Sequence, residues 1–503
     1  MANASSGGRR RLALLCLVAV IVALGWALPA AAAGRSFAEA PMQVMTKGLT
    51  AEQHLLRQVE LGRRLVRELP AEALEKAIRV PLTPEEIAAV DQAPRWVSPL
   101  KIGFVKALTP AIVVAGLDRE SLQRQPFESG LTRQNGLVWA AVVKAEDAGA
   151  IRLHVQDMLL PRNVELYVYT RSGEAYGPYT GLGPNGTGEL WAPTVFGPEA
   201  VLQLRFTGPV SDADLHGASF KVAEAGFITR NFARELQDTF LTPTPPLEKA
   251  APGTDAAWPC GNESCIVDAT CTNVAAANPA KLAVAKIEWV SGAFIYTCTG
   301  GLISDTNPSQ DNFFLTANHC ISKNSNAQNA NFYWRFATSS CNGTCPANNG
   351  WPYHTTGSTV SATGRKGDFT LLHLNASPPV GSVFLGWTSA PVANTNGANL
   401  YRISNPGFGP QVYSQHNVDT SAGTCSGWPR GERIYSRDIT GAIDGGSSGS
   451  PIVNASSQIV GQLSGTCGLS PSEVCSSGPG EANATVDGAF AFYFSTVKPF
   501  INP

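Results

Sequence analysis

The sequence lacks a surplus of charge of either sign. It holds 37 basic and 39 acidic side chains, and charged residues make up only 15% of its 503 positions. After Arg9, Arg10 and Arg11 no run of basic residues follows that could contact a phosphate backbone. We therefore predict that the protein does not bind nucleic acid.

Cysteine is nearly absent from the first half of the chain, and no Cys-x-x-Cys pair occurs in the sequence. Because structural zinc sites usually contain such pairs, we predict neither a metal nor another cofactor. Ten of the eleven cysteines lie in the second half, at positions 260, 265, 271, 298, 320, 341, 345, 425, 467 and 475. An even number of cysteines in an exported chain is typical of a disulfide framework.

The N-terminus has the pattern of a secretory signal. Three arginines precede the apolar residues 12–28, and three alanines precede Gly34. We predict a signal peptide over residues 1–33, a secreted, extracellular protein, and no stable membrane association after cleavage. An uncleaved membrane anchor is the alternative, because the apolar run is slightly long for a signal.

A chain of this length is too long for one hydrophobic core, so at least two domains are expected. Thr50 and Gln53 form a capping box before apolar residues at helical spacing, which run to Pro70. A second helix, rich in Ala and Glu, is expected to follow. We predict a helical pro-segment over residues 34–99.

Residues 100–240 contain short β-rich runs, such as 137–143 and 164–169, separated by Gly, Pro and Asn. This pattern predicts a β-sandwich, here a pro-domain or accessory domain. Four prolines between positions 243 and 252 predict a linker over residues 241–259.

Residues 260–503 are rich in Gly, Ser, Asn and Thr, and their apolar runs are short. These runs include 283–290, 313–317, 369–374 and 489–494, and no long helical period is apparent. A region of this size and pattern fits two small β-barrels that share an interface. The predicted fold class is therefore mostly β.

Glycines flank two serines, Ser447 and Ser448, in a Gly-Gly-Ser-Ser-Gly-Ser-Pro string. Such a string allows tight turns that expose a hydroxyl beside free N–H groups, as a nucleophile requires. In an α/β-hydrolase the catalytic histidine follows the serine, but the last histidine here is His416. Chain order therefore excludes that fold.

The order His, Asp, Ser remains, with Ser448 as nucleophile and the N–H groups of Gly446 and Ser448 as the oxyanion hole. His319 ends a β-like run and precedes Cys320, so a strand and a disulfide could fix its ring. Asp368 begins an apolar run that could bury its carboxylate. We predict the triad His319, Asp368 and Ser448.

Four blocks of sequence together resemble the chymotrypsin-like serine peptidases, and bacterial lysyl endopeptidases most of all. They are Cys-Thr-Gly-Gly-Leu-Ile at 298–303, Leu-Thr-Ala-Asn-His-Cys at 315–320, Asp-Phe-Thr-Leu-Leu at 368–372 and Gly-Ser-Ser-Gly-Ser-Pro at 446–451. A Ser-Cys-x-x-Asp-x-x-Cys string at 264–271 and Gly-Gln-Leu at 461–463 add to the resemblance. It covers residues 260–500 and implies a double β-barrel that hydrolyses peptide bonds.

The resemblance also implies disulfide pairs. They are Cys298 with Cys320, Cys271 with Cys341, and Cys265 with either Cys467 or Cys475. No partner is implied for Cys260, Cys345 or Cys425. Ser464 falls where the family binds the substrate backbone.

Ser447 stands where pancreatic enzymes have the aspartate that captures the new N-terminus, so activation must proceed otherwise. Ala442 occupies the position at which trypsin has the acid of its specificity pocket. Asp487 lies near the pocket acid of lysyl endopeptidases, and Asp444 is the other candidate. With Asp487 as partner, we predict that the enzyme prefers a basic residue on the N-terminal side of the cut bond, and lysine more than arginine. A pocket lined by Ala442, Gly465 and Gly488, which accepts apolar side chains, is the alternative.

The expected partners are protein or peptide substrates and the protein's own N-terminal region, in a monomer. Residues 34 to about 255 are predicted to assist folding or to cover the cleft until the linker is cut. Lys249 would then be a site of self-processing. A catalytically inactive secreted binding protein is the alternative from another functional class.

Overall fold

The structure is a computed structural model that describes residues 36–43, 50–129, 132–171, 175–232, 263–343, 353–407 and 409–503. The predicted signal peptide and linker lie outside these residues, as do Cys260, Cys345 and Lys249. Residues 38–503 form one compact unit. None of the described helices has both the length and the apolar character needed to cross a membrane.

The described chain begins with two short strands, β1 (Ala38–Glu39) and β2 (Met42–Gln43). Three helices come next: α2 (Ala51–Glu68), α3 (Ala71–Glu75) and α4 (Pro84–Asp91). The capping box predicted at Thr50 and Gln53 is present at the start of α2. Leu65 of α2 is fully buried against Tyr169 and Val201 of the sheet beneath it. The first predicted helix is therefore confirmed, and it covers one face of a β-sheet.

That sheet has six strands in the order β3-β6-β12-β8-β9, with β5 beside β6. The strands are β3 (Ile78–Arg79), β5 (Gln123–Ser129), β6 (Thr132–Lys144), β8 (Val164–Tyr169), β9 (Ala175–Tyr179) and β12 (Glu199–Phe206). Every residue of the central strand β12 is buried, as expected for a strand covered on both faces.

A second layer contains β4 (Leu100–Val114), β7 (Ala148–Leu159), β10 (Leu190–Trp191), β11 (Val195–Phe196) and β13 (Ser219–Thr229). The short helix α5 (Asp212–Gly217) precedes β13. Apolar side chains of both layers form one core cluster, which includes Leu153, Leu202 and Phe227. Two sheets with a shared core form the sandwich that the sequence predicted.

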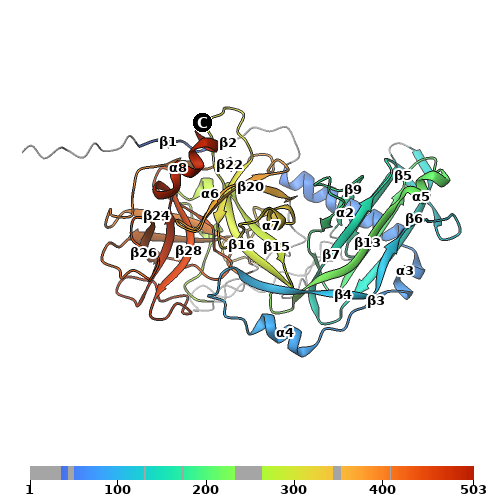
Figure 1. Ribbon diagram of the computed structural model, residues 1–503, viewed down its shortest axis with the longest axis horizontal. Coiled ribbons are helices and arrows are strands. Elements are labelled where there is room, and N and C mark those ends of the chain that lie inside the picture. The colour runs from blue at the N-terminus through green and yellow to red at the C-terminus, as the bar shows by residue number, and fades with distance from the viewer. Residues whose placement is uncertain are drawn as a thin grey trace, which may run out of the picture. The chain divides into compact units, whose positions relative to one another are not determined.

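The sheet of the second layer continues beyond the sandwich into the C-terminal half. The first residues of β4 pair with β16 (Phe294–Leu302) of the C-terminal half, with Phe104 opposite Phe294 and Leu100 opposite Thr297. One twelve-stranded sheet therefore runs through both halves of the described chain (Figure 1).

A buried ion pair accompanies this shared sheet. Nη1 of Arg152 on β7 lies 3.5 Å from Oε1 of Glu288, and both side chains are fully buried. Nη2 of Arg152 donates to the carbonyl of Asn329 at 2.6 Å, and the hydroxyl of Thr194 donates to Glu288. The sandwich thus supplies the partners of a buried carboxylate in the other half.

The first barrel of the C-terminal half is a curled, open sheet. Its strands are β15 (Val284–Ser291), β16, β17 (Phe313–Ala317), β18 (Asn331–Trp334), β19 (His354–Thr356), β20 (Ser358–Gly364) and β21 (Phe369–Leu374). The order β19-β18-β15-β16-β17-β21-β20 places β17 and β21 side by side, with Ala317 opposite Phe369. This pairing brings the ends that carry His319 and Asp368 together.

The second barrel is closed, because β28 pairs with both β27 and β29. Its six strands are β24 (Asn399–Ser404), β25 (Val412–Val418), β26 (Arg433–Thr440), β27 (Pro451–Val453), β28 (Gln458–Gly468) and β29 (Asn483–Ala489). Short strands β14 (Val267–Asp268) and β23 (Gly386–Thr388) join it, and β22 (Val383–Phe384) pairs with β2 (Met42–Gln43). The mostly β, double-barrel fold class is confirmed.

Helices in this half are few: α6 (Asn278–Ala283), α7 (Asn324–Gln328), a 3-10 turn η1 (Ala269–Cys271) and α8 (Phe490–Ile501). The apolar run 489–494 belongs mostly to α8, where the sequence predicted no helix. Phe490, Tyr493 and Val497 of α8 are buried at helical spacing. The period was hard to see because Phe492 and Phe500, which lie outside this buried stripe, are also apolar.

Four disulfides lie within the described residues. Cys298 pairs with Cys320 and Cys271 with Cys341, as the resemblance implied. Cys265 pairs with Cys475, which settles the choice left open, because Cys467 is bonded to Cys425. Cys425, Cys467 and Tyr435 pack together in one apolar cluster of the second barrel.

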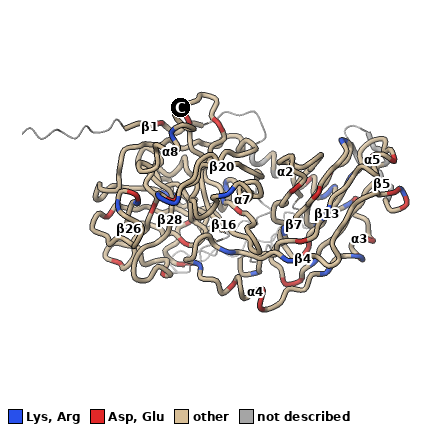
Figure 2. The backbone as a smooth tube through the Cα atoms, in the orientation of Figure 1, with Lys and Arg blue, Asp and Glu red and all other residues tan. Residues whose placement is uncertain are grey.

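Basic and acidic residues are interspersed along the described backbone (Figure 2). This distribution agrees with the balanced charge of the sequence.

Candidate active site

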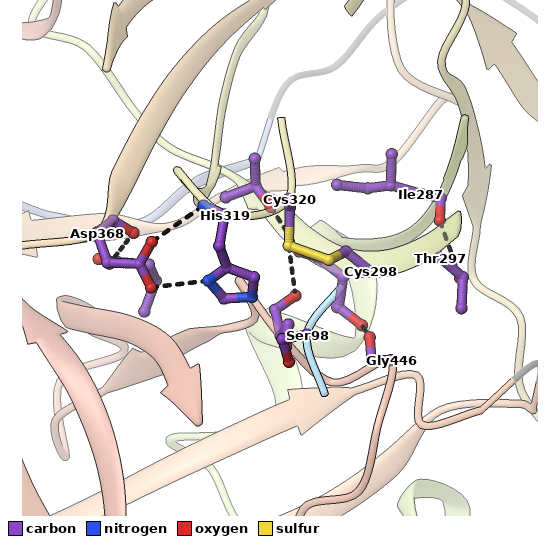
Figure 3. The surroundings of a disulfide bond; sticks show 12 residues. Ser98, Ile287, Thr297, Cys298, His319, Cys320, Asp368 and Gly446 are labelled. Carbon is purple, nitrogen blue, oxygen red and sulfur yellow. Dashed lines mark hydrogen bonds and ion pairs between the residues drawn. A yellow bond between two sulfur atoms is a disulfide. The ribbon is translucent and has the colours of Figure 1, made fainter. Parts of the chain in front are cut away.

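His319 stands two residues after β17, beside the disulfide of Cys298 and Cys320 (Figure 3). That bond ties the residue after His319 to β16, so the backbone at His319 is held from both sides. The two sulfurs lie near the imidazole, but sulfurs bonded to each other do not act as thiolate ligands. The cluster of Cys298, His319 and Cys320 is therefore not a metal site.

Asp368 lies just before β21 and faces His319. A hydrogen bond of 2.8 Å joins Oδ2 of Asp368 to Nδ1 of His319, and the backbone N–H of His319 donates to Oδ1 at 3.0 Å. The carboxylate therefore fixes both the ring and the backbone of the histidine. Nε2 of His319 is buried and has no hydrogen-bond partner among the described residues.

Asp368 favours its ionised form although its side chain is buried. Burial opposes ionisation, but the charge of His319, its two hydrogen bonds and the hydroxyl of Ser464 outweigh burial. The pKa of Asp368 is consequently lower than its ordinary value. A carboxylate that stays ionised can stabilise a positively charged imidazole.

The turn that presents Asp368 has an unusual backbone. Asp368 adopts φ 52° and the preceding Gly367 φ 76°. Nε2 of Gln462, from the Gly-Gln-Leu strand, donates to the carbonyls of Gly367 at 2.8 Å and of Asp368 at 2.9 Å. The hydroxyl of Tyr493 on α8 donates in turn to Gln462. Gln462 therefore positions the acid from behind.

The two adjacent serines point in different directions. Ser447 is fully buried, and its hydroxyl accepts a hydrogen bond from Ser404 at 3.0 Å. Ser448 lines a cavity of about 750 Å³ that His319 and Asp368 also line. Of the two hydroxyls, that of Ser448 shares a cavity with the histidine.

The turn before Ser448 leaves backbone donors available. Gly446 adopts φ 95° and Gly449 φ 80°, and a Cβ at Gly449 would lie 2.3 Å from Oγ1 of Thr316. The carbonyl of Gly445 accepts from Gly407, so the opposite end of that peptide, the N–H of Gly446, points the other way. We find no acceptor for the N–H groups of Gly446 and Ser448 among the described residues.

A segment from the N-terminal half lies in the same cavity. Residues 95–98 line it, and the hydroxyl of Ser98 is 2.7 Å from that of Ser448. Ser98, which is labelled in Figure 3, is thus a hydrogen-bond partner of Ser448. The sequence held no signal for this contact, because residues 95–98 match no motif.

The residues proposed for substrate recognition divide into two groups. Ser464 and Asp444 line the cavity. Asp487 does not, and its side chain is fully buried in an ion pair with Arg402 at 2.5 Å. The structure therefore places Ser464 and Asp444, but not Asp487, in the cavity of His319, Asp368 and Ser448.

The comparisons with known proteins agree with this geometry. Residues 261–477 match the family described as the lysyl endopeptidase C-terminal domain. The lysyl endopeptidase of Pseudomonas aeruginosa is 27% identical over 391 residues, which cover 75% of this chain and 76% of that protein. An alignment of that length extends into the N-terminal half.

Solved serine proteases are also similar. The HtrA-type protease AlgW with tripeptide is 16% identical at a TM-score of 0.32, over 45% of this chain and 62% of that one, less than two thirds of its length. The active form of Rv3671c from M. tuberculosis is 16% identical at a TM-score of 0.29, over 48% of this chain and 93% of that one.

The family match spans His319, Asp368 and Ser448, and the fold around them is a double β-barrel. The chain is therefore a serine endopeptidase that is similar to the bacterial lysyl endopeptidases.

Proposed function

We propose that the protein is a secreted endopeptidase that uses Ser448 as nucleophile, His319 as general base and Asp368 as the orienting acid. The observation that carries the proposal is the 2.8 Å bond between Asp368 and Nδ1 of His319, a residue that lines the cavity of Ser448. This bond leaves Nε2 of His319 without a hydrogen-bond partner among the described residues. No other described histidine shares that cavity.

The chemistry follows from these positions. Oγ of Ser448 attacks the peptide carbonyl while Nε2 of His319 takes its proton, and the N–H groups of Gly446 and Ser448 stabilise the oxyanion. His319 then gives the proton to the leaving amine, which departs and leaves an acyl-enzyme. A water molecule, deprotonated by His319, releases the acid product.

We propose further that residues 34 to about 255 are a precursor region that covers the cleft, and that maturation cuts the linker. The support is the position of residues 95–98 in the cavity and the 2.7 Å contact between Ser98 and Ser448. Ser98 thus takes up a hydrogen bond of the Ser448 hydroxyl, which the proposed mechanism requires for the imidazole. The presence of Ser447 in place of an aspartate fits activation by uncovering rather than by a new N-terminus.

The proposed specificity is for a basic residue on the N-terminal side of the cut bond, with lysine preferred to arginine. The relationship to lysyl endopeptidases supports it. A pocket that accepts apolar side chains is the rival within the same activity. An inactive binding protein is the rival from another class, but such a protein need not retain the triad geometry.

Labelling with a fluorophosphonate probe, followed by peptide mapping, tests the activity. The proposal requires labelling at Ser448, loss of labelling in Ser448→Ala and retention in Ser447→Ala. Digestion of an unstructured protein and sequencing of the new ends tests specificity. A processed wild-type protein that neither labels nor cleaves would contradict the proposed function.

A further inference from the structure

A buried carboxylate in the cavity has an incomplete set of partners. The side chain of Asp444 is only 7% exposed, and it lines the cavity four residues before Ser448. Its Oδ1 accepts the N–H of Gly445 at 2.6 Å. Among the described residues, Arg95 is the one cation paired with it, at a distance of 3.8 Å between Nη1 and Oδ2.

Asp487, the other acid considered as the partner of a basic substrate side chain, is already paired with a buried arginine. Arg402 is fully buried, donates to Asp487 at 2.5 Å, and also donates to the carbonyl and hydroxyl of Ser450 at 2.9 Å. The charge of Asp487 is therefore balanced inside the second barrel. A substrate cation would have to displace Arg402 to reach it.

Arg95 reaches Asp444 from the segment that lies in the cavity. Its carbonyl packs against Gly445 so closely that a Cβ there would lie 2.3 Å from the carbonyl oxygen. Ser98, three residues on, contacts Ser448. One short stretch of chain thus places a basic side chain at Asp444 and a hydroxyl at the nucleophile.

We propose that Asp444 is the carboxylate that receives the basic side chain of the substrate, and that Arg95 holds this place in the uncleaved chain. The inference rests on the proposed function and assigns its specificity to a residue other than Asp487. Trp428 and Ile443 line the same cavity and offer apolar surface to the methylene groups of a lysine or arginine.

The electrostatics of Asp444 are consistent with this role. Burial raises its pKa above the ordinary value, and the N–H of Gly445 and the charge of Arg95 oppose that rise. A buried carboxylate of this kind gains from any cation that replaces Arg95. An uncharged side chain of the same length would leave it without a partner.

The experiment compares peptides that differ only in having Lys, Arg or norleucine before the cut bond, because norleucine has the length of lysine without its charge. For processed wild-type enzyme we expect kcat/KM to be about 100-fold higher for Lys than for norleucine, as expected of a desolvated charge pair. In Asp444→Asn, which can still accept from Gly445, this ratio should fall to within a few-fold of one. Cleavage of the norleucine peptide should persist.

Glu473 provides the matched control, because it lines the same cavity but is exposed. Glu473→Gln should keep the wild-type ratio. A wild-type ratio retained in Asp444→Asn would overturn the proposal, as would loss of the ratio in Asp487→Asn alone. Either result leaves the peptidase activity intact, so it is distinct from failure of the proposed function, in which no peptide is cleaved.

A second variant keeps the test independent of the folding of Asp444→Asn. Arg95→Met alters only the segment in the cavity, and it should speed labelling of Ser448 in the full-length chain by several-fold. Asp444→Glu keeps the negative charge at this position. The double variant Arg95→Met, Asp444→Glu should therefore show the same faster labelling of Ser448 in the full-length chain. Unchanged labelling in Arg95→Met would show that Arg95 does not hold the site and would overturn that half of the proposal.

Discussion

Replacing Gly445 by alanine tests whether residues 95–98 block the active site. The φ of Gly445 lies outside the left-handed region, so its backbone accepts an alanine. The new Cβ would lie 2.3 Å from the carbonyl oxygen and 3.2 Å from the carbonyl carbon of Arg95. The third contact, with Leu100 at 3.4 Å, is of ordinary length. The clash therefore falls on the segment in the cavity and on no catalytic group.

The size of the effect follows from the nature of the clash. The atom that must move is backbone, so it cannot swing aside as the end of a side chain would. Overpacking of this kind costs about 1 to 3 kcal/mol. If that cost is borne only while residues 95–98 occupy the cavity, the open form becomes about 5- to 150-fold more populated.

The assay is the rate of fluorophosphonate labelling of the full-length band, separated by mass from processed enzyme. We expect Gly445→Ala to label faster than wild type by that factor. After processing, the two proteins should label at similar rates, because the clashing atom belongs to Arg95. Equal or slower labelling of the full-length variant would refute the idea that this segment restrains Ser448.

Three further predictions concern the triad. Ser448→Ala should abolish peptide hydrolysis with unchanged thermal unfolding, whereas Ser447→Ala should retain most activity; the reverse pattern would overturn the assignment of the nucleophile. Gln462→Leu removes the donor to two carbonyls behind Asp368, and we expect at least a tenfold loss in kcat with little change in KM, measured by steady-state kinetics. Because interactions with His319 lower the pKa of Asp368, its charge stabilises the fold at neutral pH, and this contribution disappears as the pH falls below about 4. Urea unfolding between pH 6 and 2 should therefore show a smaller loss of stability in Asp368→Asn than in wild type.

The sequence could predict which residues of the candidate site lie together, because each carries a local signal. The glycine-flanked serine, the histidine before a cysteine and the aspartate before an apolar run each carry a signal in a few residues. Pairing of β17 with β21 then brings two of them together. The order of residues along the chain sufficed to reject the α/β-hydrolase.

The contacts that the sequence did not predict depend on distant residues. Arg402 lies 85 residues from Asp487, and nothing near Asp487 indicates that its charge is already balanced. Ser98 lies 350 residues from Ser448 in a segment without a motif. Such contacts are set by tertiary packing, so the sequence could not show that Asp487 is paired inside the barrel whereas Asp444 lines the cavity.

The pairing of β4 with β16 has a consequence for solubility if the N-terminal half is cut away as proposed. Residues 294–297 of β16 form their hydrogen bonds on that side with β4, which belongs to the N-terminal half. Loss of that half would leave these N–H and C=O groups as an open sheet edge, next to the partly buried Phe294. Open edges pair readily with other chains. If maturation removes the N-terminal half as proposed, β4 covers until then an edge at which the C-terminal half could self-associate.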